Sequence, residues 1–186
     1  MNKFLINAMN TSQIIFLIIN ILGGILVLGS YYLGLKGNAG VQNLWGGTPK
    51  KIQPVYTISM LLSAIGYFLF FTYIIQRLGT GFFDGFSTLG DTIIYLVFIM
   101  ILGASTFWMP LTKKMVEASS NLLWIAIRIV LMLVALGSIG LLIVLALTNN
   151  SAGGFLYLAS VIGLGWFSFH TMVLDALLWP YFWKKK

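Results

Sequence analysis

Five long apolar segments, separated by short polar breaks, occupy most of this chain. Hydrophobic residues make up 59% of its 186 residues and charged residues only 8%, whereas roughly a quarter of the residues in a soluble domain are charged. An α-helix needs about 20 consecutive apolar residues to cross the hydrocarbon core of a bilayer, and all five segments are that long. The sequence therefore predicts an all-α integral membrane protein, a bundle of five transmembrane helices surrounded by lipid.

The predicted transmembrane helices cover residues 11–35, 54–76, 91–111, 120–147 and 154–182. Too little chain remains between them for a separate soluble domain, so residues 1–186 are expected to form a single domain. Pro54 suits the first turn of the second helix, where a missing N–H costs little. An acidic side chain at Asp91 suits the positive dipole end of the third helix.

Polar residues also mark the boundary between the third and fourth helices. The third is expected to end close to Pro110, and the connection after it would hold Lys113, Lys114 and Glu117. A hydroxyl or amide side chain is expected to cap the fourth helix: Ser119, Ser120 or Asn121.

Positive charge is distributed unevenly around these helices. Because five crossings place the termini on opposite sides, one side receives eight lysines: Lys36, Lys50, Lys51, Lys113, Lys114, Lys184, Lys185 and Lys186. The other side receives only Lys3 and Arg77. The positive-inside rule then places the C-terminus in the cytoplasm and the N-terminus outside. The net charge of +7 lies at the ends of apolar segments rather than along a soluble face, so it favours an anionic lipid surface over nucleic acid as the partner.

The composition excludes several kinds of site. Without cysteine, the chain has no disulfide, thiolate metal site or cysteine nucleophile. His170 is the single histidine, which excludes a multi-histidine metal site within one chain, and four acidic residues are too few for a carboxylate-rich cage. No metal site is therefore predicted.

Three ionisable side chains fall inside the predicted helices: Arg128, His170 and Asp175. Such residues are costly in hydrocarbon and usually face the protein interior or a water-filled cavity. Arg128 and Asp175 lie on consecutive helices at comparable depth, and an arginine side chain can reach toward its interface. We therefore expect an intramembrane ion pair between them, acting either as a staple between two helices or as part of a ligand or proton site.

His170 and Asp175 are five residues apart, which separates them by roughly 140° around an α-helix. They need not share a face, whereas acid–base catalysis requires both groups within hydrogen-bond reach of one substrate. The spacing therefore argues against an intramembrane enzyme that uses this pair, and no catalytic residue is predicted. His170 alone is either a packed, hydrogen-bonded side chain or a ligand contact.

Aromatic side chains make up 15% of the sequence. Tryptophan and tyrosine favour the membrane–water interfaces, but Trp108, Trp124 and Trp166 lie deeper in their predicted helices. An indole N–H in hydrocarbon needs an acceptor, so these three either pack within the bundle or point into a cavity. Several deep aromatic rings together would suit a flat, conjugated or polycyclic ligand.

Three helices carry a family resemblance. The relevant runs are Gln53-Pro54-Val55-Tyr56-Thr57, then Met60 and Ala64-Ile65-Gly66-Tyr67-Phe68; Ser105-Thr106-Phe107-Trp108-Met109-Pro110-Leu111; and Trp166-Phe167-Ser168-Phe169-His170-Thr171. They resemble the second, third and fifth helices of the translocator protein/TspO family of tryptophan-rich sensory proteins. That family typically reads Gly-Pro-Val-Trp-Thr, Asn-x-x-Trp-Ser-Pro-Leu and Trp-Val-x-Phe-Ala-Thr at these places. The connection 36–53 departs from the family, because it keeps only Trp45 of a tryptophan- and proline-rich run.

The resemblance implies a bundle of five helices, often a homodimer, with a ligand pocket that opens beneath the connection 36–53. It implies binding of a tetrapyrrole (a porphyrin or haem) or a sterol, in sensing or transport. The residues that would carry over to this pocket are Trp45, Tyr56, Met60, Ser105, Trp108, Trp166 and His170.

A second function also fits the sequence. Few polar groups lie inside the helices, and many small residues suit close helix packing, such as Gly137, Ser138, Gly140, Gly163 and Gly165. These features would also be expected of a structural or assembly subunit of a larger membrane complex without any ligand site.

Overall fold

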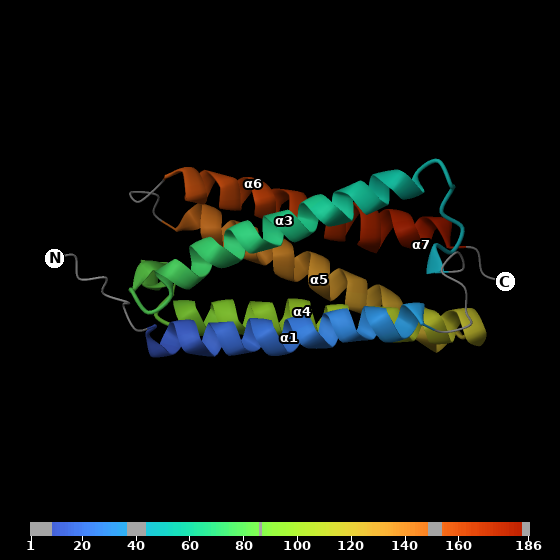
Figure 1. The fold of residues 1–186 in the computed structure, drawn as a ribbon, viewed down its shortest axis with the longest axis horizontal. Coiled ribbons are helices and arrows are strands. Elements are labelled where there is room, and N and C mark those ends of the chain that lie inside the picture. The colour runs from blue at the N-terminus through green and yellow to red at the C-terminus, as the bar shows by residue number, and fades with distance from the viewer. Residues whose placement is uncertain (1–8, 37–43, 86, 149–153, 184–186) are drawn as a thin grey trace.

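The protein forms an elongated bundle of long helices in the computed structural model (Figure 1). The structure describes residues 9–36, 44–85, 87–148 and 154–183. The first four spans are α1 (Thr11–Leu35), α3 (Gln53–Arg77), α4 (Gly90–Glu117) and α5 (Asn121–Leu147). The fifth begins as α6 (Phe155–Phe169), continues as the π-helix η3 (His170–Leu178) and ends as α7 (Trp179–Phe182). All five are long and apolar enough to cross a membrane, and the described residues include no strand, which confirms the predicted fold class.

Local sequence signals set most of the helix ends. Asn10 caps α1 by accepting a hydrogen bond from the Gln13 N–H, and the Gln13 side chain accepts from the Asn10 N–H in return. Pro54 lies in the first turn of α3, as predicted, and the Ser120 hydroxyl caps α5. Between α3 and α4, the short 3-10 helix η1 (Phe82–Gly85) buries Phe83 against the core.

The predicted end of the third helix was wrong. α4 continues through Pro110 to Glu117, so Lys113 and Lys114 lie in its last turns and the connection to α5 is only 118–120. A proline is tolerated inside a membrane helix because neighbouring groups compensate for the lost backbone hydrogen bond. α4 packs along both α1 and α5, and Met109 on one side of Pro110 and Thr112 on the other are both buried. This packing holds the helix together across the proline.

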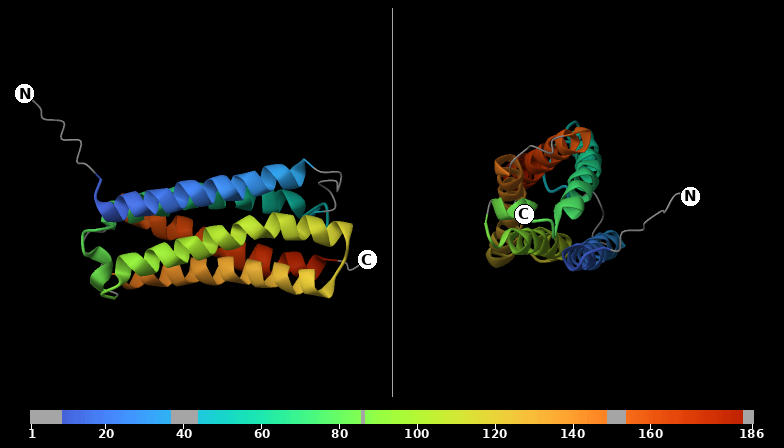
Figure 2. Two further views of the ribbon diagram at one scale, coloured as in Figure 1. Left: turned by 90° about the horizontal axis from the view of Figure 1, so that it is seen from below. Right: turned by 90° about the vertical axis from the view of Figure 1, so that its left-hand side faces the viewer.

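Neighbouring helices in the bundle pair closely. α3 lies along α6, α4 lies along α5, and α1 packs on the outer side of α4 (Figure 2). α3 and α6 come closest at Gly66 and Gly163, where a Cβ on Gly66 would lie 2.4 Å from the Gly163 carbonyl oxygen. Only glycine allows the two backbones to approach this closely. Figure 1 places the start of α1 and the end of α7 at opposite ends of the bundle.

The described lysines gather at one end of the bundle, which we call the lysine-rich end: Lys36, Lys50, Lys51, Lys113 and Lys114. The last turns of α1 and α4, the starts of α3 and α5, and α7 meet there (Figure 1). At the opposite end, the described residues carry Arg77, Asp84 and Asp91, and the Asp91 carboxylate accepts a hydrogen bond from the Gly79 N–H at 2.8 Å.

Candidate functional site

Aromatic side chains from most of the elements meet near the lysine-rich end. We call this group the aromatic cluster: Tyr31, Trp45, Tyr56, Trp108, Trp124, Trp179 and Trp183. The Trp108 ring lies 5.6 Å from that of Tyr31 and 5.9 Å from that of Trp179, measured between centroids. Trp179 also lies 4.8 Å from Trp183, and Trp45 lies 6.0 Å from Tyr56. The cluster therefore brings together five of the six tryptophans in the sequence.

Four of the residues that the sequence singled out as ligand contacts belong to this cluster: Trp45, Tyr56, Trp108 and Trp124. Within the described part of the chain, the Trp108 indole nitrogen is buried without a hydrogen-bond partner. One turn further along α4, the hydroxyl of Thr112 is also buried and unpartnered among these residues. Two polar atoms one turn apart on α4 are therefore buried without a partner among the described residues.

Three of the remaining predicted contacts lie outside the cluster. Met60 and Trp166 are 46% and 41% exposed, and the Trp166 indole donates a hydrogen bond to the Ser59 carbonyl at 3.3 Å. Ser105 is half-buried on α4. The eighth predicted contact, His170, is 7% exposed and begins the π-helix η3. That these residues bind a ligand stays a prediction.

The π-helix overturns the geometric argument about His170 and Asp175. In an α-helix the two side chains would point roughly 140° apart. Hydrogen bonds from i to i+5 widen the helix at His170–Leu178, and the His170 Nε2 and Asp175 Oδ2 atoms approach to 3.4 Å. The expectation that the pair need not share a face was therefore wrong, because both residues lie in a π-helix rather than an α-helix.

Hydrogen bonds from neighbouring helices hold this π-helix. The Ser59 hydroxyl of α3 lies 3.0 Å from His170 Nδ1, and the Tyr56 hydroxyl donates to the Leu174 carbonyl at 3.1 Å. On the other side, the Ser138 hydroxyl of α5 lies 2.9 Å from that of Thr171. Most π-helices are single turns and many occur at functional sites, so nine residues held from two neighbouring helices mark this segment as a candidate site.

The ion pair predicted between Arg128 and Asp175 is not formed in the described part of the chain, where Asp175 pairs with His170 instead. Arg128 is exposed, and its neighbour Ile127 is fully buried. Because consecutive residues point about 100° apart on a helix, burying Ile127 turns Arg128 away from the core. Arg128 lies only seven residues from the start of α5, roughly 10 Å, so its side chain can reach the interface.

α1 and α3 are joined at one end and diverge at the other. At the end of the bundle opposite the lysine-rich end, the Asn10 side chain donates to the Leu78 carbonyl at 2.9 Å. The Gln13 side chain donates to the Ile75 carbonyl, also at 2.9 Å. Further along, the Tyr67 hydroxyl donates to Asn20. Beyond this point the two helices separate toward the lysine-rich end, as Figure 1 shows.

Asp175 lies beside the aromatic cluster. The carbonyl of the preceding residue, Leu174, accepts a hydrogen bond from the Tyr56 hydroxyl of the cluster at 3.1 Å. The Asp175 side chain is 33% exposed.

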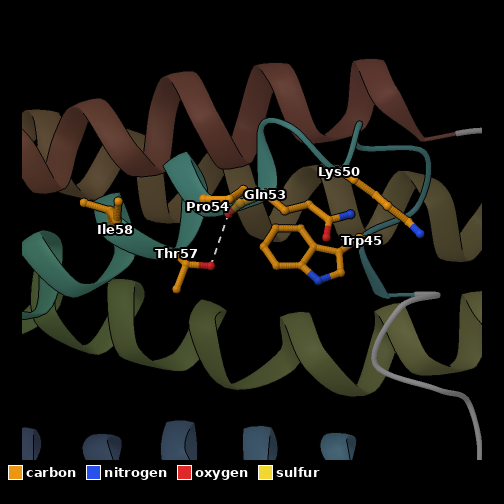
Figure 3. Close-up of a pocket in the computed structure, with 6 residues that line it drawn as sticks. All are labelled: Trp45, Lys50, Gln53, Pro54, Thr57 and Ile58. Carbon is orange, nitrogen blue, oxygen red and sulfur yellow. Dashed lines mark hydrogen bonds between the residues drawn. The ribbon is translucent and has the colours of Figure 1, made fainter.

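A shallow groove of about 420 Å³ lies at the start of α3 (Figure 3). Its lining residues are Trp45, Lys50, Gln53, Pro54, Thr57 and Ile58. The groove is open, so it is not the enclosed pocket that a buried ligand would need. Trp45 connects it to the aromatic cluster through its contact with Tyr56.

The comparisons with known proteins add no identification. No family model, no curated protein and no solved structure matches this chain. The family resemblance therefore rests on the sequence motifs alone. Within the described residues, no three His, Cys, Asp or Glu side chains are placed to hold a metal ion.

The sequence reasoning missed several residues of this site, among them Trp179, Trp183, Tyr31 and Ser59. Ser59 carried a signal, because it lies three residues after Tyr56 and therefore on the same face of α3. Tyr31 had only a weak one, since a tyrosine near the end of a membrane helix ordinarily belongs to the interface.

Proposed function

We propose that this membrane protein binds a flat, hydrophobic small molecule of the polycyclic class, a tetrapyrrole or a sterol-like compound, within the helical bundle. The proposed site is the aromatic cluster. The observation that carries the proposal is the Trp108 indole nitrogen, which is buried among aromatic faces without a partner in the described chain. Small-molecule sites combine apolar, aromatic walls with a few such polar groups.

The arrangement supports a role in sensing or transport. Aromatic faces supply stacking surfaces, and the unpartnered groups of Trp108 and Thr112 lie on one side of α4. Lys50 and Trp45 in the neighbouring groove would suit an acidic substituent at the edge of the ring system, as a porphyrin carries. A ligand in this place would touch α1, α3, α4 and α7 together, so its binding would change how these helices pack.

Replacing Trp108 by phenylalanine is expected to weaken porphyrin binding about tenfold. The substitution keeps an aromatic ring but removes the N–H donor, and an unmade buried hydrogen bond costs about 1–3 kcal/mol. Protoporphyrin is titrated into the purified protein, and saturable quenching of tryptophan fluorescence gives the affinity.

The matched control is Trp166→Phe, which also removes one indole but lies outside the aromatic cluster. Equal weakening by both variants would contradict the placement of the site at Trp108. The absence of any saturable response to porphyrin, or to a sterol that competes with it, would reject the proposed function.

A second candidate function is that of a structural or assembly subunit, and α1 is the observation that favours it. α1 packs mainly on α4, and a Cβ on Gly24 or Gly29 would meet no atom of the described chain within 4 Å. Its Leu28 side chain is 72% exposed. This face would suit lipid, a partner helix or a second copy in a homodimer. A stoichiometric partner protein after purification in mild detergent would favour this function over ligand binding.

We also propose that the lysine-rich end faces the cytoplasm, with the N-terminus outside. The proposal rests on the lysine distribution and the positive-inside rule.

Because the chain has no cysteine, single cysteines can report this orientation. Lys51→Cys and Thr80→Cys place exposed thiols at opposite ends of the bundle. In intact cells, a membrane-impermeant maleimide is expected to label Thr80→Cys only, and Lys51→Cys is expected to react after permeabilisation. The reverse pattern would contradict the orientation.

A further inference from the structure

We propose that the groove at the start of α3 binds an anionic phospholipid, with its phosphate at Lys50 and one acyl chain along the outer face of α3. The inference goes beyond the proposed function, because the ligand is a membrane lipid and its place is the open groove rather than the aromatic cluster. The ligand class is a glycerophospholipid whose headgroup carries a net negative charge.

The groove is polar at one end and apolar at the other. Figure 3 shows Lys50, Gln53 and Trp45 at its polar end, whereas Ile58 lies at the opposite end, a turn further along α3. The groove is open, so a molecule that stays partly in the bilayer can enter it from the side. A polar end that continues into an apolar end matches the headgroup and acyl chain of a lipid.

An apolar stripe on α3 continues from the groove along the helix. Residues spaced by three and four share one helix face. Counted in this way from Ile58, the next residues on that face are Leu61, Ile65 and Phe68. All four side chains are more than half exposed. From Ile58 to Phe68 the helix rises roughly 15 Å, about half of the hydrocarbon core of a bilayer. The stripe is therefore about as long as one acyl chain in its own leaflet.

The Lys50 ammonium is available to an anion. Among the described residues it takes part in no ion pair and no hydrogen bond, whereas the Lys36 ammonium donates to the Tyr32 hydroxyl at 2.8 Å. Lys50 is exposed, and no carboxylate of the described chain lines the groove. Hydrogen bonds from an ammonium to a phosphate are roughly twice as strong as those between neutral groups. The charge of the groove is therefore complementary to a lipid phosphate.

The polar end of the groove has fixed walls at the depth of the headgroups. The Trp45 ring is half-buried and packs edge-on against Tyr56, with centroids 6.0 Å apart. The Gln53 side chain donates to the Thr48 carbonyl at 3.1 Å, which ties the preceding segment to the first turn of α3. Tryptophan and lysine side chains at the ends of membrane helices lie at the membrane–water interface. A phosphate in the groove would therefore lie at its ordinary depth in the bilayer.

The neighbouring charge favours an anionic headgroup over a zwitterionic one. Lys51 is exposed next to Lys50. In phosphatidylcholine a quaternary ammonium accompanies the phosphate, and the two lysines would repel it. In the orientation proposed above, this end of the bundle lies at the cytoplasmic leaflet, whose surface carries anionic lipids.

The test compares phosphatidylglycerol with phosphatidylcholine of the same acyl chains. Each lipid is titrated separately into the purified full-length protein in mild detergent, and native mass spectrometry gives the affinity for the first lipid bound. Wild-type protein is expected to bind phosphatidylglycerol about tenfold more tightly, the worth of one charge-assisted contact. Lys50→Gln keeps a polar side chain but removes the charge, so it is expected to lose most of this preference.

Lys51→Gln is the matched control, because it removes an equally exposed charge at the adjacent position but does not line the groove. Lys50→Arg conserves the charge and is expected to keep the preference. Thermal unfolding verifies that each variant is folded. Loss of the preference in Lys50→Gln, with its retention in Lys51→Gln and Lys50→Arg, supports the inference.

Equal binding of the two lipids by wild-type protein overturns the inference. So does an equal loss in Lys50→Gln and Lys51→Gln, which would show a diffuse effect of charge rather than a site in the groove. Inorganic phosphate that binds as tightly as phosphatidylglycerol would show that the acyl chain contributes nothing, and this also overturns it.

The porphyrin titration keeps this inference separate from the proposed function. Porphyrin and lipid are titrated each alone, because an acidic porphyrin substituent would compete for Lys50. Saturable porphyrin binding without any lipid preference rejects the inference and leaves the proposed function standing. A lipid preference that depends on Lys50, without porphyrin binding, supports the inference and rejects the proposed function.

Discussion

Replacing Gly66 by alanine is expected to destabilise the bundle by several degrees of melting temperature, although the change adds a single methyl group. A Cβ at this position would lie 2.4 Å from the carbonyl oxygen of Gly163, well inside van der Waals contact. The obstructing atom belongs to a backbone, so no side chain can rotate away, and α3 and α6 must separate. Overpacking of this kind costs about 1–3 kcal/mol and occasionally more. Thermal unfolding in detergent, followed by circular dichroism, measures the effect.

Gly140→Ala on α5 is the control for this experiment. A Cβ there would meet no described atom within 4 Å, and alanine is the better helix former by about 1 kcal/mol. Gly140→Ala is therefore expected to be neutral or stabilising. Gly163→Ala should destabilise as Gly66→Ala does, since its Cβ would lie 2.8 Å from the Gly66 Cα atom. A melting temperature unchanged in both Gly66→Ala and Gly163→Ala would contradict the close crossing of α3 and α6.

His170→Ala is expected to have the second largest effect on stability. The substitution leaves two groups without their partner: the Asp175 carboxylate and the Ser59 hydroxyl. It also removes one side of the contact that accompanies the π-helix. Removing one member of a buried pair is more harmful than removing both, because the remaining polar group is buried alone.

A double-mutant cycle isolates this interaction. His170→Ala, Asp175→Ala and the double variant are unfolded in denaturing detergent, and their free energies of unfolding are compared. Because a third of the Asp175 side chain is exposed, the coupling is expected at the lower end of the usual range, about 1 kcal/mol. Additive effects would show that the contact at 3.4 Å contributes nothing to stability.

The sequence alone predicted the helices well and their ends less well. α1 covers the predicted residues 11–35, α3 extends one residue beyond the prediction at each end, and α5 begins one residue later than predicted. α4 was the exception, because Pro110 and the lysines after it resemble a helix end in sequence. The backbone stays helical through Pro110 because Met109 and Thr112 are buried against neighbouring helices, and such tertiary contacts override the local preference to end a helix.

The candidate site was predicted in composition but not in arrangement. Trp45, Tyr56, Trp108 and Trp124 were singled out and do gather in one cluster. Trp166 and Met60 were not brought to it: both are more than a third exposed, and the Trp166 indole donates to the Ser59 carbonyl instead. The sequence reports which residues a helix carries, whereas the rotation of the helix depends on its neighbours.

The amino-acid sequence by itself determined that this chain forms five membrane helices. Its apolar segments are long and carry few charges, and in lipid a helix satisfies the hydrogen bonds of every backbone N–H and C=O group within the segment. Only the tertiary structure decided what Asp175 faces. Burial of Ile127 turned Arg128 outward, and hydrogen bonds from Tyr56 and Ser138 accompany a π-helical turn that brings His170 to Asp175. Helix rotation and helix type depend on contacts between segments far apart in the chain, and no local pattern encodes them.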